Sequence, residues 1–231
     1  MNNIDCVVSL TSWKGRIKNS EVPKVIFSII RQKTKYKFKI CLTLSLEEFP
    51  NKNADLPEIL NLLEEHGNIE IIWSVGNLKA LKKLYPVMDL YPDIPILTTD
   101  DDILLYDNAI ETFMDEHIKR PNIILTEKGW KMGIPGMVCT GSFRLFPPNS
   151  LYKLSPTYFI KYFNCCEDDP YLALLAKLNN TGTAILRYGI CEEIKTPELN
   201  KTALKNEYRK RPWRRCYNDL TKALKSKGIM E

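Results

Sequence analysis

The stretch ILTTDDDILLY, residues 96–106, sets three adjacent aspartates, Asp100, Asp101 and Asp102, between two apolar runs. Carboxylates this close repel one another, and burying any of them unpaired is costly. The apolar run before them is typical of a buried strand, so the triplet stands where that strand is predicted to end. A solvated turn would accommodate the three charges, and so would a divalent cation.

Strands and helices alternate along the first half of the chain. The predicted strands are residues 4–10, 38–46, 69–75 and 94–99, and the predicted helices between them are residues 22–32, 56–66 and 78–90. Alternation of this kind predicts an α/β fold with a parallel or mostly parallel sheet covered by helices. Ligands bind such sheets beyond the carboxyl ends of the strands, which is where the aspartates are predicted to lie.

The order of elements is less regular after residue 107. We expect a helix at 108–119, a strand at 123–126, a glycine-bearing loop at 127–137 and a helix at 170–178, followed by a basic tail. No internal repeat, low-complexity segment or linker interrupts the chain. We therefore expect one domain over residues 1–231, with a nucleotide-binding first half at 1–107 and a more irregular second half at 108–231.

The composition is that of a soluble globular protein. Of 231 residues, 44% are apolar and 26% are charged, and the formal net charge of +5 is too modest to indicate nucleic-acid binding. Seven cysteines without a CxxC spacing predict reduced thiols in a cytosolic protein. No apolar run is long enough to cross a bilayer, and the N-terminus has no signal-peptide pattern. We expect a cytoplasmic protein.

The aspartate triplet has the chemistry of a metal site. In an Asp-x-Asp arrangement at a strand end, Asp100 and Asp102 project similarly and Asp101 turns away. Carboxylate oxygens suit hard cations such as Mg²⁺ and Mn²⁺, which are commonly held by one or two aspartates and substrate phosphates. Zinc is not expected, because the two histidines lie far from any cysteine. A plain acidic turn is the alternative.

A second acidic cluster, Glu167, Asp168 and Asp169, precedes the predicted helix at 170–178. Negative charge is favoured at a helix N-terminus, and helix capping alone would explain one of these acids. Three consecutive acids exceed what a cap needs. A carboxylate in this position with a depressed pKa stays ionised, so it could accept a proton from a hydroxyl nucleophile.

A set of motifs in this order resembles the GT-A type bacterial glycosyltransferases, in particular polysaccharide-assembly enzymes related to inverting family-2-like transferases. The motifs are VSLTSWKGRI, VPKVIFSIIRQ, KICLTLSLEEFP, LKKLYP, YPDIPILTTDDDILLY, PGMVCTGSFRLFPPNSL and CCEDDPYLALL. The resemblance covers residues 4–178. It implies a Rossmann-like, mixed and mostly parallel sheet flanked by helices.

The resemblance implies a nucleotide-sugar-binding donor half at residues 1–107 and an acceptor-binding half at 108–231, and it also implies the roles of several residues. Asp100 and Asp102 would hold Mn²⁺ or Mg²⁺ against the diphosphate of a nucleotide sugar, a UDP-sugar. The further donor-binding residues that it implies are Leu10, Thr11, Ser12, Arg16, Lys82, Lys83, Asp100 and Asp101. A solvated helix face is the alternative interpretation of the two lysines. Asp168 matches the general base of inverting members, and Asp169 is the second candidate.

The implied reaction is transfer of a sugar to a hydroxyl of a glycan or lipid-linked saccharide in surface polysaccharide synthesis. Asp168 would deprotonate that hydroxyl, and attack from the opposite face would invert the anomeric carbon. The loop at 127–137 with Trp130 would stack on the sugar or close over it, unless it is a plain surface loop. The family's late histidine ligand has no counterpart beyond residue 117, so water or another acid would complete the metal coordination.

Two alternatives to an enzyme remain. A non-catalytic nucleotide-sugar or polysaccharide-binding protein could have the same fold. The basic tail could bind nucleic acid, but the acidic centre would repel phosphates, so no nucleic-acid partner is expected. We instead expect the basic and aromatic residues at 208–217 to contact anionic membrane at the inner face of the cell membrane, since such residues suit that interface.

Overall fold

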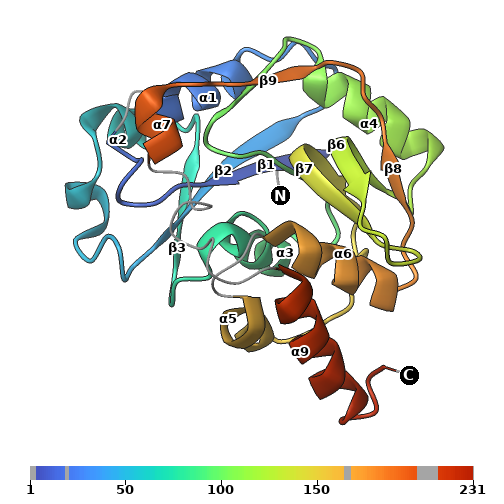
Figure 1. Ribbon diagram of the computed structural model, residues 1–231. Coiled ribbons are helices and arrows are strands. Elements are labelled where there is room, and N and C mark those ends of the chain that lie inside the picture. The colour runs from blue at the N-terminus through green and yellow to red at the C-terminus, as the bar shows by residue number, and fades with distance from the viewer. Residues whose placement is uncertain (1–3, 19–20, 164–167, 202–212, 231) are drawn as a thin grey trace.

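A mixed sheet runs through the centre of the protein (Figure 1). The computed structural model describes residues 4–18, 21–163, 168–201 and 213–230, and seven strands within these ranges form the sheet in the order β3-β2-β1-β4-β7-β6-β8. The strands are β1 (Cys6–Thr11), β2 (Phe38–Ser45), β3 (Glu70–Ser74), β4 (Ile96–Thr98), β6 (Ile124–Lys131), β7 (Val138–Phe146) and β8 (Thr183–Ile185). Only β7 is antiparallel to its neighbours in this sheet, which confirms the predicted mostly parallel arrangement.

Helices cover both faces of the sheet. The α-helices of the described ranges are α1 (Glu21–Ile30), α2 (Glu58–Glu65), α3 (Tyr85–Leu90), α4 (Ala109–Lys119), α5 (Thr157–Phe163), α6 (Asp168–Leu178), α7 (Pro197–Lys201) and α9 (Trp213–Lys225). Figure 1 shows α1, α2 and α4 above the sheet and α3, α5, α6 and α9 below it. No helix within the described ranges is both long and apolar enough to span a bilayer.

Two apolar cores result from this layering. Along β1, Val8 and Leu10 join the core beneath α1, α2 and α4, whereas Val7 joins the core with α3, α5, α6 and α9. Successive residues of a strand point to opposite faces, so a strand covered on both sides is apolar throughout. This explains why β1 is mostly apolar, with Ser9 as its one fully buried polar residue.

The predicted helix at 78–90 is wrong in one respect, because the structure divides it. A 3₁₀ helix, η2 (Lys79–Lys83), ends at Leu84, and α3 begins at Tyr85. Pro86 follows in the first turn of α3, where its missing N–H and fixed φ are tolerated, whereas inside one continuous helix it would remove a hydrogen bond. The break turns Lys82 and Lys83 inward.

The predicted loop at 127–137 is largely a β-hairpin. Strand β6 continues to Lys131, and β7 begins at Val138. A Cβ on Gly129 would lie 2.6 Å from the carbonyl oxygen of Cys139, so this glycine permits close strand pairing. The turn itself uses Gly133 and Gly136, both with positive φ.

The remaining elements connect the two halves of the chain. A short 3₁₀ helix, η1 (Lys52–Asp55), precedes α2. Strand β5 (Ile103–Leu105), directly after the aspartate triplet, pairs antiparallel with β9 (Cys191–Glu193). In the main sheet, β4 from residues 1–107 lies beside β7 from residues 108–231. The division into a donor half and an acceptor half stays a prediction.

Candidate active site

The aspartate triplet lies at the carboxyl edge of the sheet, beside the end of β1. From β1 the chain builds outward through β2 to β3, while β4 lies on the other side of β1. The connection after β1 therefore runs toward β2, whereas the connection after β4 runs the other way along the sheet edge. In α/β sheets a crevice opens where two neighbouring connections diverge in this manner. Ser12 follows β1 and Asp100 follows β4 at this point.

Asp101 anchors the triplet to the end of β1. Ser12 Oγ donates a hydrogen bond to Asp101 Oδ2 at 2.6 Å, and Arg16 Nη1 donates to Asp101 Oδ1 at 2.5 Å. The same Arg16 nitrogen donates to Asp102 Oδ2 at 3.0 Å, and Arg16 Nη2 donates to the carbonyl oxygen of Leu199 at 3.2 Å. Burial raises the pKa of Asp101 against the opposing charge of Arg16. Asp101 is thus an interior group that fixes the loop.

Asp100 and Asp102 are more accessible than Asp101. Their side chains are 39% and 18% exposed, against 8% for Asp101. Lys83 Nζ donates to Asp100 Oδ1 at 2.6 Å. Within the described ranges, Asp100 Oδ2 and Asp102 Oδ1 accept no hydrogen bond. Burial, with the charges of Asp100 and Asp101, raises the pKa of Asp102 to about 6.

The second acidic cluster meets the first through two buried cations. Asp168 and Asp169 begin α6, and Glu167 lies outside the described residues. Lys83 Nζ lies 3.2 Å from Asp168 Oδ2. Arg144 Nη1 donates to Asp169 Oδ1 at 2.5 Å, and Arg144 Nη2 lies 3.4 Å from Asp168 Oδ2. The structure therefore brings together acids that are far apart in sequence.

The two aspartates at the start of α6 differ in proton affinity. Burial pushes the pKa of Asp168 upward, but the charges of Lys83 and Arg144 outweigh burial and hold that pKa below its ordinary value. Burial raises the pKa of Asp169 to about 7, and the charge of Asp168 contributes to this rise. Environments that separate the pKa values of two neighbouring carboxyls are typical of acid–base sites.

The charges of the described residues at this site do not balance. The described carboxylates are Asp100, Asp101, Asp102, Asp168 and Asp169, and the described cations among them are Arg16, Lys83 and Arg144. Five negative charges against three positive ones leave an excess of two when every carboxyl is ionised. A divalent cation would neutralise that excess.

The donor set fits Mg²⁺ or Mn²⁺ only with help from a ligand. Within the described residues, no group of three or more His, Cys, Asp or Glu side chains forms a metal cluster. Asp100 and Asp102 each keep one carboxylate oxygen without a described hydrogen bond. Two carboxylates completed by substrate phosphates are a common magnesium arrangement. A phosphate-bearing ligand would therefore have to complete the coordination.

Lys82 and Lys83 are both buried, which excludes the solvated helix face as their interpretation. They are 1% and 3% exposed. Lys82 Nζ contacts Glu48 Oε2 at 2.9 Å and Asn77 Oδ1 at 3.2 Å, and the charge of Asp101 also acts on it. Burial lowers the pKa of Lys82 against the opposing charge of Glu48. Lys82 joins the loops after β2 and β3, whereas Lys83 belongs to the carboxylate site.

The predicted donor residues on β1 are positioned differently from one another. Leu10 is fully buried in the core, and its side chain lies among apolar neighbours. Thr11 is half-buried, and its hydroxyl donates to the carbonyl oxygen of Thr43 at 2.6 Å. Ser12 alone among the three contacts the aspartate triplet. Contact of these residues with a nucleotide stays a prediction.

Arg144 is a site residue that the sequence analysis did not identify as one. It lies on β7, 1% exposed, opposite Thr98 of β4 and Thr126 of β6. Its guanidinium also approaches Asp100, at 3.8 Å. The sequence does contain one indication of this role, a single arginine within the apolar strand run FRLF. A charge buried in a central strand requires partners.

Trp130 lies on the β6–β7 hairpin and is 49% exposed. The indole rests near Gly141, whose added Cβ would lie 3.8 Å from Trp130 Cζ3. Among the hydrogen bonds and ring contacts of the described residues, none joins the indole to Asp100, Asp101 or Asp102. Stacking of Trp130 on a sugar stays a prediction.

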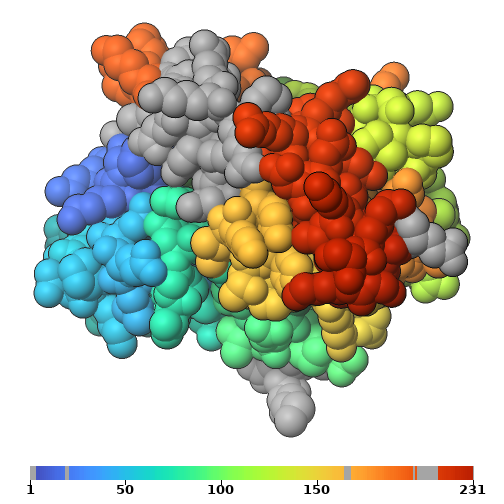
Figure 2. Space-filling model, turned by 60° about the horizontal axis from the view of Figure 1, so that its bottom comes forward, coloured from blue at the N-terminus to red at the C-terminus, as the bar shows by residue number. Residues whose placement is uncertain are grey.

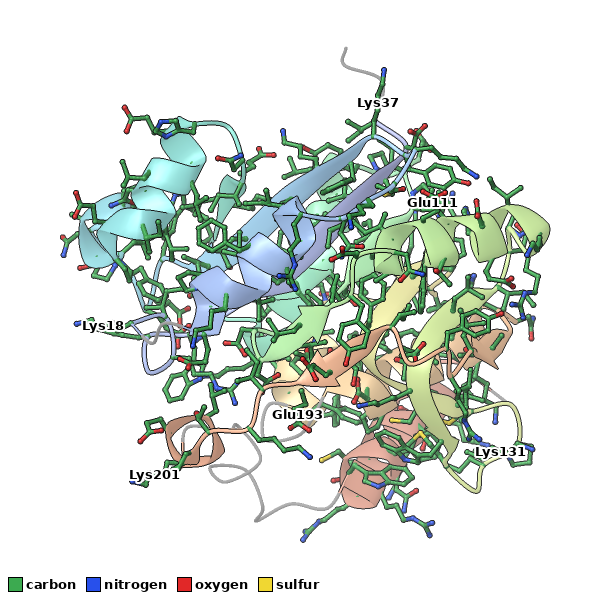
Figure 3. All side chains as sticks on the ribbon, turned by 90° about the horizontal axis from the view of Figure 1, so that it is seen from above. Lys18, Lys37, Glu111, Lys131, Glu193 and Lys201 are labelled. Atoms are coloured by element: carbon green, nitrogen blue, oxygen red, sulfur yellow. The ribbon has the colours of Figure 1, made fainter. Side chains whose placement is uncertain are left out.

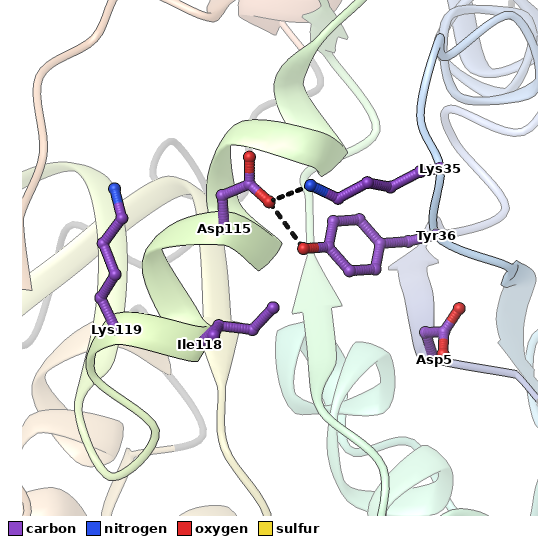
Figure 4. A pocket seen from close by; sticks show the side chains of 6 residues that line it. All are labelled: Asp5, Lys35, Tyr36, Asp115, Ile118 and Lys119. Carbon is purple, nitrogen blue, oxygen red and sulfur yellow. Dashed lines mark hydrogen bonds and ion pairs between the residues drawn. The ribbon is translucent and has the colours of Figure 1, made fainter.

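An open surface hollow lies at the opposite, amino edge of the sheet (Figure 4). Its lining residues are Asp5, Lys35, Tyr36, Asp115, Ile118 and Lys119. Tyr36 Oη donates to Asp115 Oδ1 at 2.6 Å, and Lys35 Nζ lies 2.9 Å from the same oxygen. Figure 3 shows Lys37 and Glu111 on this side of the molecule, with Lys18 and Lys201 toward the other end of β1. The hollow is therefore separate from the carboxylate site.

No family model matches this chain, and no curated protein matches it in sequence. Solved structures with the same fold do exist. TarS of S. aureus is 11% identical with a TM-score of 0.50, covering 86% of this chain and 38% of TarS. TarS 1-349 in complex with UDP is also 11% identical with a TM-score of 0.50, covering 86% of this chain and 63% of that one.

A third structure, 4-diphosphocytidyl-2C-methyl-D-erythritol synthase, is 11% identical with a TM-score of 0.49, covering 87% of this chain and 98% of that one. The likeness to TarS confirms the GT-A-like fold: a mostly parallel sheet flanked by helices. The chain spans less than two thirds of either TarS structure.

Proposed function

We propose that the protein is a glycosyltransferase that moves a sugar from a nucleoside-diphosphate sugar, a UDP-sugar, to a hydroxyl group. The acceptor is a glycan or lipid-linked saccharide in bacterial surface polysaccharide synthesis. One observation carries the proposal: the acidic triplet after β4 and the acids of α6 meet around Lys83 and Arg144 at the carboxyl edge of a GT-A-like sheet. The UDP bound to the similarly folded TarS supports the donor class.

The triplet is assigned to the donor. Asp100 and Asp102 would hold Mn²⁺ or Mg²⁺, which when bound neutralises negative charge on the departing nucleoside diphosphate. Arg16 keeps Asp102 oriented through its hydrogen bond at 3.0 Å, and Asp101 keeps Arg16 in place. Lys83 fixes Asp100 from the buried side. These contacts pre-organise the carboxylates, so little reorientation is needed when the donor binds.

The start of α6 is assigned to proton transfer. Asp168 is ionised at neutral pH because Lys83 and Arg144 hold its pKa below the ordinary value. Its carboxylate takes the proton of the acceptor hydroxyl as the oxygen bonds to the anomeric carbon. The bond from that carbon to the diphosphate breaks, and the configuration inverts. Asp169, with a pKa of about 7, is the second candidate for the base.

A second function has one observation in its favour. Asp168 is 5% exposed and already paired with Lys83 and Arg144, so its carboxylate is occupied in the absence of ligand. A non-catalytic protein that binds a nucleotide sugar or a polysaccharide would need no accessible base. Such a protein would bind UDP-sugar without releasing UDP.

The experiment that tests the proposal is metal-dependent UDP release. Purified protein is incubated with a panel of UDP-sugars and saccharide acceptors, with Mn²⁺, Mg²⁺ or a chelator, and UDP is quantified. We expect release that requires metal and falls about 1000-fold or more in Asp100→Asn and Asp102→Asn, because the donor charge loses its counter-ion site. Asp107→Asn serves as the matched control, because Asp107 is an exposed aspartate after β5 whose partners among the described residues are Lys33 and Arg31.

The outcomes separate the alternatives. Unchanged turnover in both triplet variants would reduce the triplet to an acidic turn. Binding of UDP-sugar by wild-type protein without UDP release under any condition would favour the binding protein. Thermal unfolding of each variant shows whether a lost activity reflects a lost fold.

A further inference from the structure

Helices α5 and α9 lie side by side on one face of the protein (Figure 2). Both are anchored from within. On α9, Cys216, Leu220 and Leu224 are fully buried in the core that also contains α6. On α5, Phe159 and Phe163 pack against the Tyr171 ring of α6, with ring centroids 5.2 and 5.5 Å apart. The outward side chains of the two helices therefore form one fixed surface.

The outward residues of this surface are strongly basic. We call it the α5–α9 face; its charged and apolar members are Ile160, Lys161, Arg214, Arg215, Lys222, Lys225 and Lys227, all exposed. Residues 157–163 and 213–227 carry six basic side chains and one acid. Their net charge of +5 equals the formal net charge of the whole chain, so the other residues sum to zero. The two helices thus carry a local excess of positive charge.

The α5–α9 face also carries tyrosines whose rings are already engaged. Tyr158 and Tyr162 stack with ring centroids 6.2 Å apart. Lys227 Nζ donates to the Tyr158 hydroxyl at 2.8 Å, at the edge of that ring, and Lys161 Nζ lies 5.3 Å from the centroid of the Tyr162 ring. Exposed Ile160, on the opposite side of α5 from these tyrosines, adds apolar surface.

We infer that the α5–α9 face docks on a bilayer surface that contains anionic lipid. Tyrosines beside lysines and an exposed aliphatic side chain suit the boundary between headgroups and acyl chains. Each lysine or arginine near such a surface multiplies the partition constant about fivefold. The predicted membrane contact lies at residues 208–217, of which 213–217 are described. The α5–α9 face adds α5 and the last turns of α9 to that contact. It does not depend on catalysis.

Flotation of the full chain with vesicles tests the inference. Vesicles of phosphatidylcholine alone are compared with vesicles that contain phosphatidylglycerol, over a series of salt concentrations. We expect binding only to the anionic vesicles, weakening as salt rises. The variant R214Q/R215Q/K222Q/K225Q should bind several hundredfold more weakly, on the order of four fivefold steps. Ile160→Ser should weaken binding by a smaller, salt-independent factor.

A matched control removes the same charge elsewhere. The variant K24Q/K33Q/K37Q/K52Q loses four exposed lysines from other elements and should keep wild-type binding within about threefold. Equal losses in the two quadruple variants would overturn the inference, and so would equal binding to neutral vesicles. Binding of single-stranded RNA or an anionic glycan in preference to anionic vesicles would assign the face to that polyanion and overturn the membrane role. UDP release in solution should be the same in both variants.

Discussion

The two acidic clusters are held in opposite ways. The triplet after β4 is bound to its neighbour strand, since Asp101 accepts hydrogen bonds from Ser12 and Arg16, both directly after β1. The acids of α6 have their partners on other elements, Lys83 on η2 and Arg144 on β7. The first cluster keeps carboxylate oxygens facing outward, whereas the second is enclosed by cations. The comparison indicates a division of roles: binding a charged ligand in the first, moving a proton in the second.

The substitution with the largest expected effect tests this division of roles. Asp168→Asn should lower turnover about 100-fold to 10,000-fold while leaving the affinity for donor almost unchanged, because a general base acts only in the chemical step. Steady-state kinetics over donor concentration measure both quantities. Asp169→Asn is the matched substitution, and a larger loss in it than in Asp168→Asn would transfer the role of base to Asp169.

Removing the shared cation should break the second cluster. Arg144→Met leaves Asp168 and Asp169 buried without their guanidinium, and we expect the free energy of unfolding to fall by about 3–5 kcal/mol. Urea unfolding measures this change. Adding Asp169→Asn to Arg144→Met should restore part of the loss, because one of the unpaired charges is then gone.

Arg120→Met is the control for that prediction. Arg120 is an arginine paired with Glu116 at the surface, 34% exposed. Its loss should cost less than about 1 kcal/mol. A similar cost for the two arginines would show that Arg144 does not hold the acids of α6 together.

The smallest expected effect is a dependence of stability on pH. In the folded protein the pKa of Asp102 is about 6 and that of Asp169 about 7, above the unfolded value of roughly 4. The folded state therefore binds protons more tightly, so this stabilisation is complete below about pH 4 and is lost as pH rises through 6 and 7. The lowered pKa of Asp168 contributes nothing in this window, because Asp168 is already ionised.

We expect the free energy of unfolding to fall by on the order of 2 kcal/mol between about pH 6 and pH 8. Denaturant unfolding at the two pH values measures it. Asp102→Asn and Asp169→Asn should each flatten the profile, and Mg²⁺ should restore stability at the higher pH. Stability that rises over this range would contradict the prediction.

The first half of the fold could be predicted from the sequence because its strands are covered on both faces. Mostly apolar runs such as β1 and helical spacing such as that of α1 leave clear patterns. Strands β5, β8 and β9 were missed, since each spans three residues and is defined by a distant partner. Helix α9 was interpreted only as a basic tail, although Cys216, Leu220 and Leu224 stand at helical spacing.

The site was predictable in its acids but not in its cations. Aspartates between apolar runs are conspicuous, because each carries a cost that needs an explanation. In the sequence, Lys83 fits a solvated helix face as well as it fits a donor site. Pro86 is the indication that the predicted helix at 78–90 is broken. Arg144 lies in a strand whose neighbours on both sides are set by tertiary pairing, so no local pattern reveals what its guanidinium meets.

The hydrogen bond from Arg16 to the carbonyl oxygen of Leu199 joins residues 183 positions apart. At a synthesis rate of about 5–20 residues per second, roughly 10–40 s separate the emergence of the two from the ribosome. The strands β1 to β4 can pair during that interval, but the acidic loop would then face solvent without its late-arriving cover. A nascent chain shorter than 199 residues therefore lacks the carbonyl that caps Arg16, and its acidic loop is held by Ser12, Arg16 and Lys83 until the second half of the chain folds against it.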